Sequence, residues 1–293
     1  MKNLKQPVIR KKNSPKQLSI DYAQDHEQLY NHAIEKSNMS SQPSQIIIFS
    51  ETNGVRYLHF DSEWVQGAMR LKKPWYLELE YAQQMMAWLL FLDPPQHIVQ
   101  LGLGAASLTK FCYHRFTNSQ INVVELNSLV ITAARSMFAL PDNDERLNVI
   151  HDDAYNYIHQ NNLLGKVGVL QVDCYDAQAN GPTLSSLAFY RACRNLMGQP
   201  AIATINLFGE HPSFQKNMKH LKKVFNNRVI ALPATVDGNR IAIAFNGPAL
   251  RFPFSIMQKR AQFIKKTWGL PALEWLEELK IENTINQDNE LII

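Results

Sequence analysis

Short apolar runs alternate with amphipathic segments along most of the chain. Between about residues 97 and 225, runs with the length of buried strands are separated by stretches in which apolar residues recur every three or four positions, as in helices. This alternation predicts an α/β fold with a doubly wound, mostly parallel sheet. The predicted strands are 98–101, 122–126, 147–151, 167–173 and 201–208, and the predicted helices are 105–116, 128–138, 154–160, 184–197 and 211–225.

The pattern changes near its C-terminal end. The strand-like runs 228–235 and 240–246 flank Val236-Asp237-Gly238-Asn239, in which Asp-Gly predicts a hairpin. Four residues cannot form the crossover helix that two parallel strands need. The last strand is therefore expected to be antiparallel, as in the fold of S-adenosylmethionine-dependent methyltransferases.

Before the sheet, the runs 45–49, 55–60 and 64–69 are separated by turn signals and predict a small antiparallel β meander. The segment after it, 76–92, has a helical period and is predicted to be one helix. We therefore divide the chain into four parts. They are a mobile basic arm (1–43), an N-terminal β meander (44–75), an α/β (Rossmann-like) domain (76–250) and a C-terminal helical extension (251–293).

Composition describes a globular protein with a basic arm. Of the 293 residues, 45% are hydrophobic and 19% are charged, which is typical of a globular protein. The net charge is +4, but six basic residues precede the first acid, Asp21, so the rest of the chain carries −2. No basic stripe interleaved with aromatic residues follows, which argues against a nucleic-acid partner.

The cysteines and the hydropathy of the chain indicate where in the cell the protein is located. Cys112, Cys174 and Cys193 are odd in number and widely spaced, which excludes a disulfide framework and a CxxC zinc or redox site. The longest apolar run, 85–92, is too short to span a bilayer, and the N-terminus lacks the apolar core of a secretory signal. We expect a cytoplasmic protein without a membrane segment or a metal site.

The stretch 98–126 carries the strongest functional signal. Its first strand is followed by Gly102-Leu103-Gly104, and its second strand ends at Glu125. In nucleoside-binding sheets, such glycines let the backbone approach the ligand, and such an acid accepts hydrogen bonds from ribose hydroxyls. Ser107 stands in place of a third glycine, which counts against NAD. The alternative is an ordinary β–α–β turn whose glutamate binds nothing.

Acids also follow the third and fourth predicted strands. Asp152-Asp153 follows the third strand, where a carboxylate can accept a hydrogen bond from an adenine amino group, and Asp173 and Asp176 follow the fourth. Ligands of open sheets bind outside the carboxyl ends of the strands, so these acids point to one nucleoside site. Two carboxylates can hold a cationic amine, and one can remove the proton that the amine must lose before it attacks carbon. The alternative is a solvated loop or a helix cap.

From about residue 45 to residue 246, the order of these parts resembles the spermidine synthase (polyamine aminopropyltransferase) family. The resemblance implies decarboxylated S-adenosylmethionine as co-substrate, no metal, and a putrescine-like amine as acceptor. It also implies that Gln66 helps to hold the aminopropyl or sulfonium part of the nucleoside, that Glu125 binds ribose, and that Asp153 beside Asp152 binds adenine.

The same resemblance implies roles for three further residues. Asp173 is the expected base, Asp176 the expected contact of the amine, and Tyr81 the tyrosine that assists from the preceding helix.

The chain departs from the family pattern at three places. The glycine loop of the family reads GGGDGG, and Ala105 stands here where its aspartate binds the amino end of the aminopropyl group. The acid that usually follows the helix tyrosine is absent from 82–84, and Ala177 replaces a proline. The residues expected for the nucleoside site are retained, and some of those expected for the amine site are replaced. This pattern indicates a divergent, spermidine synthase-like member.

Three functions stay open at this point. The first is aminopropyl transfer to an amine. The second is a methyltransferase that uses intact S-adenosylmethionine, which Ala105 favours because an aspartate would repel the carboxylate of that cofactor. The third is a nucleoside-binding pseudoenzyme. The sequence also leaves the oligomeric state open, and a homodimer is possible.

Overall fold

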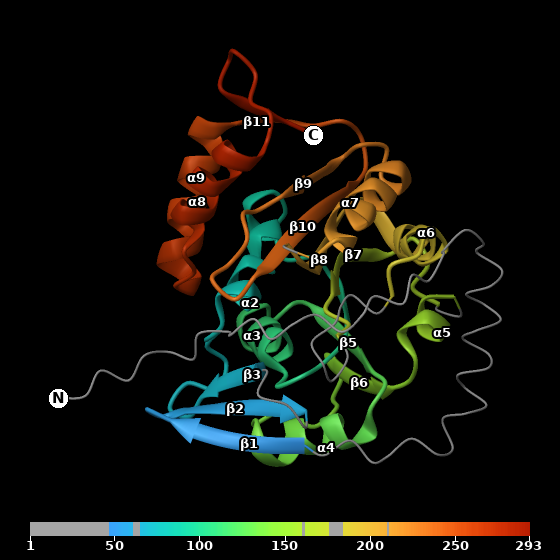
Figure 1. The fold of residues 1–293 in the computed structure, drawn as a ribbon, viewed down its shortest axis with the longest axis vertical. Helices are drawn as coiled ribbons and strands as arrows, with labels where there is room; N and C mark the ends of the chain where they lie inside the picture. Colours follow the sequence, from blue (N-terminus) through green and yellow to red (C-terminus); the bar gives the residue numbers. More distant parts are fainter. Residues whose placement is uncertain (1–46, 61–64, 160–161, 176–183, 210) are drawn as a thin grey trace. The chain divides into compact units, whose positions relative to one another are not determined.

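The structure, a computed structural model, describes residues 47–60, 65–159, 162–175, 184–209 and 211–293 (Figure 1). The predicted arm, 1–43, and Asp176 lie outside these ranges.

A seven-stranded sheet forms the centre of the described chain, with the strand order β6-β5-β4-β7-β8-β10-β9. Neighbouring strands from β6 to β8 are parallel, and β10 is antiparallel to both β8 and β9. This order confirms the predicted fold class. The strands are β4 (His97–Leu101), β5 (Gln120–Glu125), β6 (Leu147–His151), β7 (Val167–Val172), β8 (Met197–Phe208), β9 (Val229–Ala231) and β10 (Asn239–Asn246).

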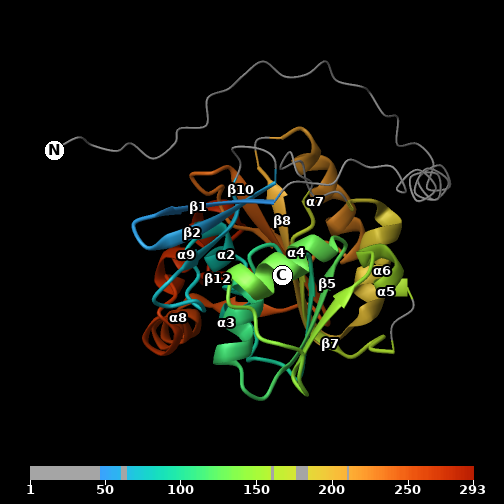
Figure 2. The ribbon, with the colours of Figure 1, turned by 90° about the horizontal axis from the view of Figure 1, so that it is seen from below.

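Helices cover both faces of the sheet (Figure 2). One face packs against α5, α6 and α7 in a core that includes Tyr157, Phe189 and Leu221. The opposite face packs against α3, α4, the β meander and the C-terminal helices, with Phe111, Val130 and others in a second core. The five helices between strands are α3 (Ser107–Arg115), α4 (Ser128–Met137), α5 (Ala154–His159), α6 (Leu187–Leu196) and α7 (Ser213–Val224).

The predicted meander is present as an antiparallel sheet of β1 (Ile47–Thr52), β2 (Val55–Phe60) and β3 (Val65–Arg70). The predicted final hairpin differs in detail. The strand expected over 228–235 ends at Ala231, and the connection to β10 is longer than four residues. Within it, the N–H groups of Leu232 and Thr235 still donate to the carbonyl oxygens of Ile241 and Asn239, and the turn falls at 236–238, inside the predicted turn.

The single helix predicted over 76–92 is wrong. The segment forms a short helix α2 (Glu80–Gln84) and then a 3₁₀ turn η2 (Ala87–Leu90). Every residue from 85 to 90 is at most 1% exposed, so the segment is enclosed on all sides and has no solvent-facing stripe. Packing against the sheet and the C-terminal helices therefore decides its path, and the helical period of the sequence does not.

After the sheet, the two predicted helices are confirmed as α8 (Phe254–Trp268) and α9 (Ala272–Glu282). A small pair of strands, β11 (Arg251–Pro253) and β12 (Glu290–Ile292), joins the two ends of this region and was not predicted, because three residues show no period. Among the described helices, none is both long and apolar enough to cross a membrane.

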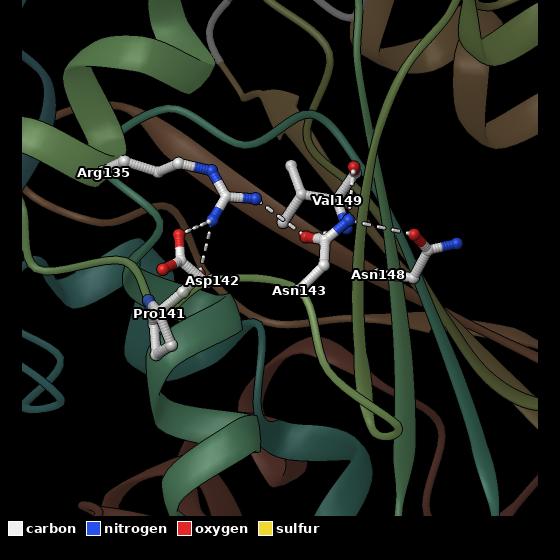
Figure 3. Close-up of polar contacts among 6 residues, drawn as sticks. All are labelled: Arg135, Pro141, Asp142, Asn143, Asn148 and Val149. Atoms are coloured by element: carbon white, nitrogen blue, oxygen red, sulfur yellow. Dashed lines mark hydrogen bonds and ion pairs between the residues drawn. The ribbon is translucent and has the colours of Figure 1, made fainter.

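A polar network ties down the loop between α4 and β6 (Figure 3). The guanidinium of Arg135 donates to the carbonyl oxygen of Pro141 at 3.0 Å, to Asp142 Oδ1 at 2.8 Å and to Asn143 Oδ1 at 2.8 Å. The side chain of Asn143 also bonds both backbone groups of Val149, in β6. The middle of β6, the strand that leads to Asp152, is thus tied to this loop.

Candidate active site

The site lies where the strand order reverses, at the carboxyl ends of β4 and β7. Gly102 follows β4 and Asp173 follows β7, and the Asp173 N–H donates to the Leu101 carbonyl oxygen at 2.8 Å. Gly102 has a φ of +96°, and a Cβ on it would overlap the carbonyl oxygen of Asp173. The structure therefore brings the predicted glycine and the predicted base into direct contact.

Glu125 organises the glycine loop from the end of β5. Its Oε2 accepts the Leu103 N–H at 3.0 Å, and its Oε1 accepts the Asn127 N–H at 2.9 Å. Burial raises the pKa of this carboxyl group, and the backbone N–H groups oppose that shift. The N–H groups of Gly104 and Leu126 also contact this carboxylate, so four backbone donors fix its orientation beside the glycine loop.

The strand β3 runs beside the glycine loop and carries Gln66 to it. A Cβ on Gly104 would lie 3.2 Å from the carbonyl oxygen of Gln66. One residue further, a Cβ on Gly67 would meet the Cβ of Ala105 at 2.5 Å, and Ala105 is only 2% exposed. At the loop position where an aspartate was expected, the methyl group of Ala105 thus packs against Gly67.

Asp152 and Asp153 follow β6, next to Glu125, whose carbonyl oxygen accepts the Asp152 N–H at 3.1 Å. Asp153 Oδ1 accepts the N–H groups of Tyr155 and Asn156, at 2.7 and 3.3 Å, and thereby caps α5. Asp152 Oδ1 accepts the Asp153 N–H at 2.7 Å. Asp153 is thus the cap of α5, whereas the later helix α6 is capped by Ser186.

Asp173 receives two side-chain hydrogen bonds. The hydroxyl of Tyr81, from α2, donates to its carboxylate, and Asn206 Nδ2, from β8, donates to Oδ1 at 2.9 Å. Asn206 Oδ1 in turn accepts Asn239 Nδ2 at 3.1 Å. Burial raises the pKa of Asp173, and the two donors oppose the shift. Burial and the Asp173 charge also raise the pKa of Tyr81, so its hydroxyl stays protonated and able to donate.

Sequence reasoning missed Asn206 and Asn239. A signal for Asn206 existed, because it is a polar residue in the apolar run 201–208, close to the carboxyl end of a strand. Asn239 stands at the start of the hairpin strand β10 and offers no such signal. Through these two side chains, hydrogen bonds connect Asp173, which follows β7, to β8 and β10.

Three other side chains that could act as nucleophile or base have structural partners. Cys174 donates its S–H to the Leu101 carbonyl oxygen at 3.4 Å, and burial raises its pKa, so the thiol is not activated. His151 bonds the Leu126 carbonyl oxygen, and His211 bonds Ser213. Within the described ranges, no group of three or more His, Cys, Asp or Glu residues could hold a metal ion.

The sheet order, with one antiparallel strand inserted between β8 and β9, defines an α/β protein of the S-adenosylmethionine-dependent methyltransferase fold class. Two solved structures share this fold. One is a probable spermidine synthase from Corynebacterium glutamicum (TM-score 0.64, 16% identity, 82% of this chain and 93% of that chain). The other is human methyltransferase-like protein 13 in complex with SAH (TM-score 0.56, 22% identity, 65% and 93%). No protein-family model matches the chain.

Curated relatives give the finer assignment. The chain is 33% identical over 238 residues to a polyamine aminopropyltransferase of Neisseria meningitidis serogroup A, which covers 81% of this chain and 90% of that protein. It is 30% identical over 234 residues to a polyamine aminopropyltransferase of Chromobacterium violaceum, with coverage of 80% and 89%. The chain belongs to the polyamine aminopropyltransferase family, as the order of its motifs predicts.

Proposed function

We propose that this chain transfers the aminopropyl group of decarboxylated S-adenosylmethionine to a putrescine-like amine. The observation that carries the proposal is the contact of Asp173 with both Tyr81 and Asn206 at the point where the strand order reverses. Its relatives, named as polyamine aminopropyltransferases, support the same reaction.

The residues of the site fit the nucleoside part of this co-substrate. Glu125 holds the glycine loop and is the expected partner of the ribose hydroxyls, and Gln66, whose carbonyl oxygen lies near Gly104, is the expected contact of the sulfonium end. Asp152 and Asp153 stand at the next strand end, where we expect the adenine. When bound, the co-substrate supplies a carbon that is activated by its positive sulfur.

Asp173 would do the proton chemistry of the transfer. An ammonium group must lose one proton before its nitrogen lone pair can attack carbon, and the carboxylate of Asp173 accepts that proton. The new carbon–nitrogen bond forms as the carbon–sulfur bond breaks, and the sulfur leaves as the neutral thioether of methylthioadenosine. Tyr81 and Asn206 orient the carboxylate, and positioning supplies the remaining rate enhancement. Asp176 remains the predicted second contact of the amine.

Ala105 favours one competing reaction, methyl transfer from intact S-adenosylmethionine. Its methyl group packs against Gly67, so this part of the loop carries no charge to discriminate between the two cofactors. We nevertheless favour aminopropyl transfer, because an acid with two hydrogen-bond donors suits deprotonation of an alkylamine. We also propose a cytoplasmic location, which the free thiols of Cys112, Cys174 and Cys193 support.

The test is turnover of the parent and of Asp173→Asn with decarboxylated S-adenosylmethionine and a panel of diamines. The substitution keeps the shape and removes the proton acceptor, so kcat should fall about 10²–10⁴-fold while methylthioadenosine still binds. In the parent, kcat/KM should fall as the pH is lowered through the raised pKa of Asp173, because the protonated acid cannot accept a proton.

Asp142→Asn is the matched control, because the Asp142 side chain is 98% exposed and lies in the loop after α4. Its kcat should equal that of the parent. Equal turnover of Asp173→Asn and the parent would contradict the assignment of the base. Methylation of an acceptor, with no aminopropyl transfer, would favour the competing reaction.

A further inference from the structure

Positive charge is concentrated in the stretch that forms α6 and α7. From residue 184 to residue 228, the sequence contains seven lysines and arginines and a single acid, Glu210, so this stretch carries +6. The whole chain after residue 16 carries only −2. Helices α6 and α7 pack against each other over the same face of the sheet (Figure 1, Figure 2). That face of the molecule is therefore the positive one.

The lysines of α7 form a stripe along its outer side. The helix buries Phe214 and Leu221 in the core beneath it. Lys219, Lys222 and Lys223 are exposed, and with 3.6 residues per turn they project from the other side within an arc of about 100°. The sequence does not show this stripe as a continuous run, because buried residues interrupt it.

The stripe has no acidic partner in the described part of the chain. Among the described residues, no ion pair joins Lys219, Lys222 or Lys223 to a carboxylate. The three side chains surround one open hollow of about 400 Å³, which is lined by Gln215, Met218, Lys219, Lys222, Lys223 and Asn227. Ammonium groups around one hollow repel one another, so an anion that binds there relieves the repulsion.

The composition of this surface argues against a protein or a small molecule as the ligand. In the described parts of α6 and α7, no large apolar side chain is exposed, whereas protein interfaces have an apolar centre and contain few lysines. Of the six described residues that line the hollow, Met218 alone is apolar, whereas small-molecule pockets are mostly apolar. Interfaces with nucleic acids are much more positively charged, and their phosphates accept hydrogen bonds from lysine.

The burial of the aromatic rings favours a duplex over a single strand. The aromatic residues of α7, Phe214 and Phe225, are 5% and 1% exposed, so this helix offers no ring on which unpaired bases can stack. The bases of a duplex already stack on one another. The major groove of B-form DNA is about 12 Å wide and admits a helix, whereas the major groove of A-form RNA is too narrow. Duplex DNA therefore fits the lysine stripe best.

We propose that the lysine stripe of α7, made of Lys219, Lys222 and Lys223, binds the phosphate backbone of duplex DNA without reading its sequence. Each ammonium group pairs with a phosphate and releases a bound counterion. The sequence argued against a nucleic-acid partner because aromatic residues are not interleaved with the basic ones, but phosphate contacts do not need them. The inference goes beyond the proposed function, because the three lysines are separate from the residues proposed for the reaction.

The experiment is fluorescence anisotropy of a labelled DNA duplex of mixed sequence, titrated with the full chain at salt concentrations from about 50 to about 200 mM. The triple variant Lys219→Gln/Lys222→Gln/Lys223→Gln removes three charges from an exposed surface. Each lost phosphate contact should make the slope of log K against log salt shallower by about 1, so we expect a total change of about 2–3. Binding at about 50 mM salt should weaken at least about tenfold.

The matched control is Lys259→Gln/Lys265→Gln/Lys266→Gln on α8. These lysines are also exposed, and α8 packs on the opposite face of the sheet, so the control removes the same charge from another surface. It should bind the duplex within about threefold of the parent. Equal weakening by the two triple variants would overturn the inference, because the effect would then follow from net charge alone. No binding by the parent at about 100 μM protein and about 50 mM salt would also overturn it.

Competition tests the choice of duplex DNA. Unlabelled duplex DNA should displace the labelled duplex better than a single strand, an RNA duplex or polyglutamate. Stronger displacement by the single strand or the RNA duplex would overturn the choice of DNA duplex, and stronger displacement by polyglutamate would indicate an acidic protein segment instead. Both triple variants should keep the thermal midpoint and the kcat of the parent, because the replaced side chains are exposed and separate from the proposed active site. Since anisotropy needs no turnover, DNA binding through the stripe stands even if the proposed aminopropyl transfer is not found.

Discussion

Gly102 has a φ of +96°, and its Cα faces the carbonyl oxygen of Asp173, so both the backbone and the available space restrict this position to glycine. Its neighbour Ala106 also lies in the left-handed region, with a φ of 56°, where it precedes the first turn of α3. The loop therefore accepts a methyl group at position 106 although the backbone there is left-handed. It excludes one at position 102, because Gly102 lies against the end of β7.

We expect Gly102→Ala to lower the free energy of unfolding by about 3 kcal/mol, since backbone strain and the overlap with Asp173 add. Gly165→Ala is the matched control. Gly165 has a φ of +71°, but a Cβ on it would meet nothing within 4 Å, so only the strain of about 1 kcal/mol applies. Urea unfolding of both variants measures the difference. Equal losses would show that the contact with Asp173 adds nothing.

At the scale of elements, a chain of buried amides connects the sheet to the helix of Tyr81. Thr109 Oγ1 donates to Gln100 Oε1 at 2.7 Å, and Gln100 Nε2 donates to Gln171 Oε1 at 2.8 Å. Gln171 Nε2 then donates to the Met85 carbonyl oxygen at 3.0 Å, at the end of α2. Since α2 is short and has no side-chain cap, this bond helps to fix the helix that presents Tyr81.

Gln171→Leu should lower the free energy of unfolding by about 2–4 kcal/mol, because it leaves the Met85 carbonyl oxygen buried without its partner and Gln100 Nε2 with only the Cys112 sulfur as acceptor. The kcat should also fall, because α2 then holds Tyr81 less firmly against Asp173. Asn148→Ala removes an exposed amide that accepts one hydrogen bond from Asn143, and it should cost less than about 1 kcal/mol. Urea unfolding provides the comparison. A loss for Gln171→Leu no larger than that of Asn148→Ala would show that the amide chain does not stabilise the fold.

Elements were predicted well where the sequence shows either a helical apolar stripe or a short continuous apolar run. Strand β4 and helix α4 match their predicted ranges within a residue, because each has a clear apolar stripe or run. The stretch 76–92 was predicted poorly despite its helical period, because its central residues, 85–90, are buried on all sides and packing decides their path.

At the scale of the whole molecule, a buried lysine couples stability to pH. Lys110 on α3 is 3% exposed and donates to the Phe138 carbonyl oxygen at 2.6 Å, at the C-terminal end of α4. Arg56 of the meander donates to the neighbouring Met137 carbonyl oxygen. Two cations thus join the meander and α3 to the negative end of the α4 dipole. Burial lowers the pKa of Lys110 to about 7.

This shift predicts that stability rises with pH above about 7. In the unfolded chain Lys110 keeps its proton up to its ordinary pKa near 10.4, whereas the folded chain releases it near 7. The unfolded state therefore binds more protons between these values, and this group adds at most about 1.4 kcal/mol of stability per pH unit as the pH rises. Urea unfolding at pH 7, 8 and 9 should show this gain in the parent and not in Lys110→Met. Parallel pH dependences of the two proteins would contradict the prediction.

The sequence by itself determined the sheet and which strand ends carry Gly102, Glu125 and Asp173. Alternating runs specify parallel strands, and the carboxyl ends of parallel strands share one edge, so Gly102, Glu125 and Asp173 could be placed together from their order alone. Only the tertiary structure decided which side chains contact Asp173 and one another across distant parts of the chain. Tyr81 meets Asp173, Asn206 meets Asn239, and Gln84 meets Glu278 across 194 positions. No local period encodes such contacts, because they depend on how helices and strands distant in sequence pack against one another.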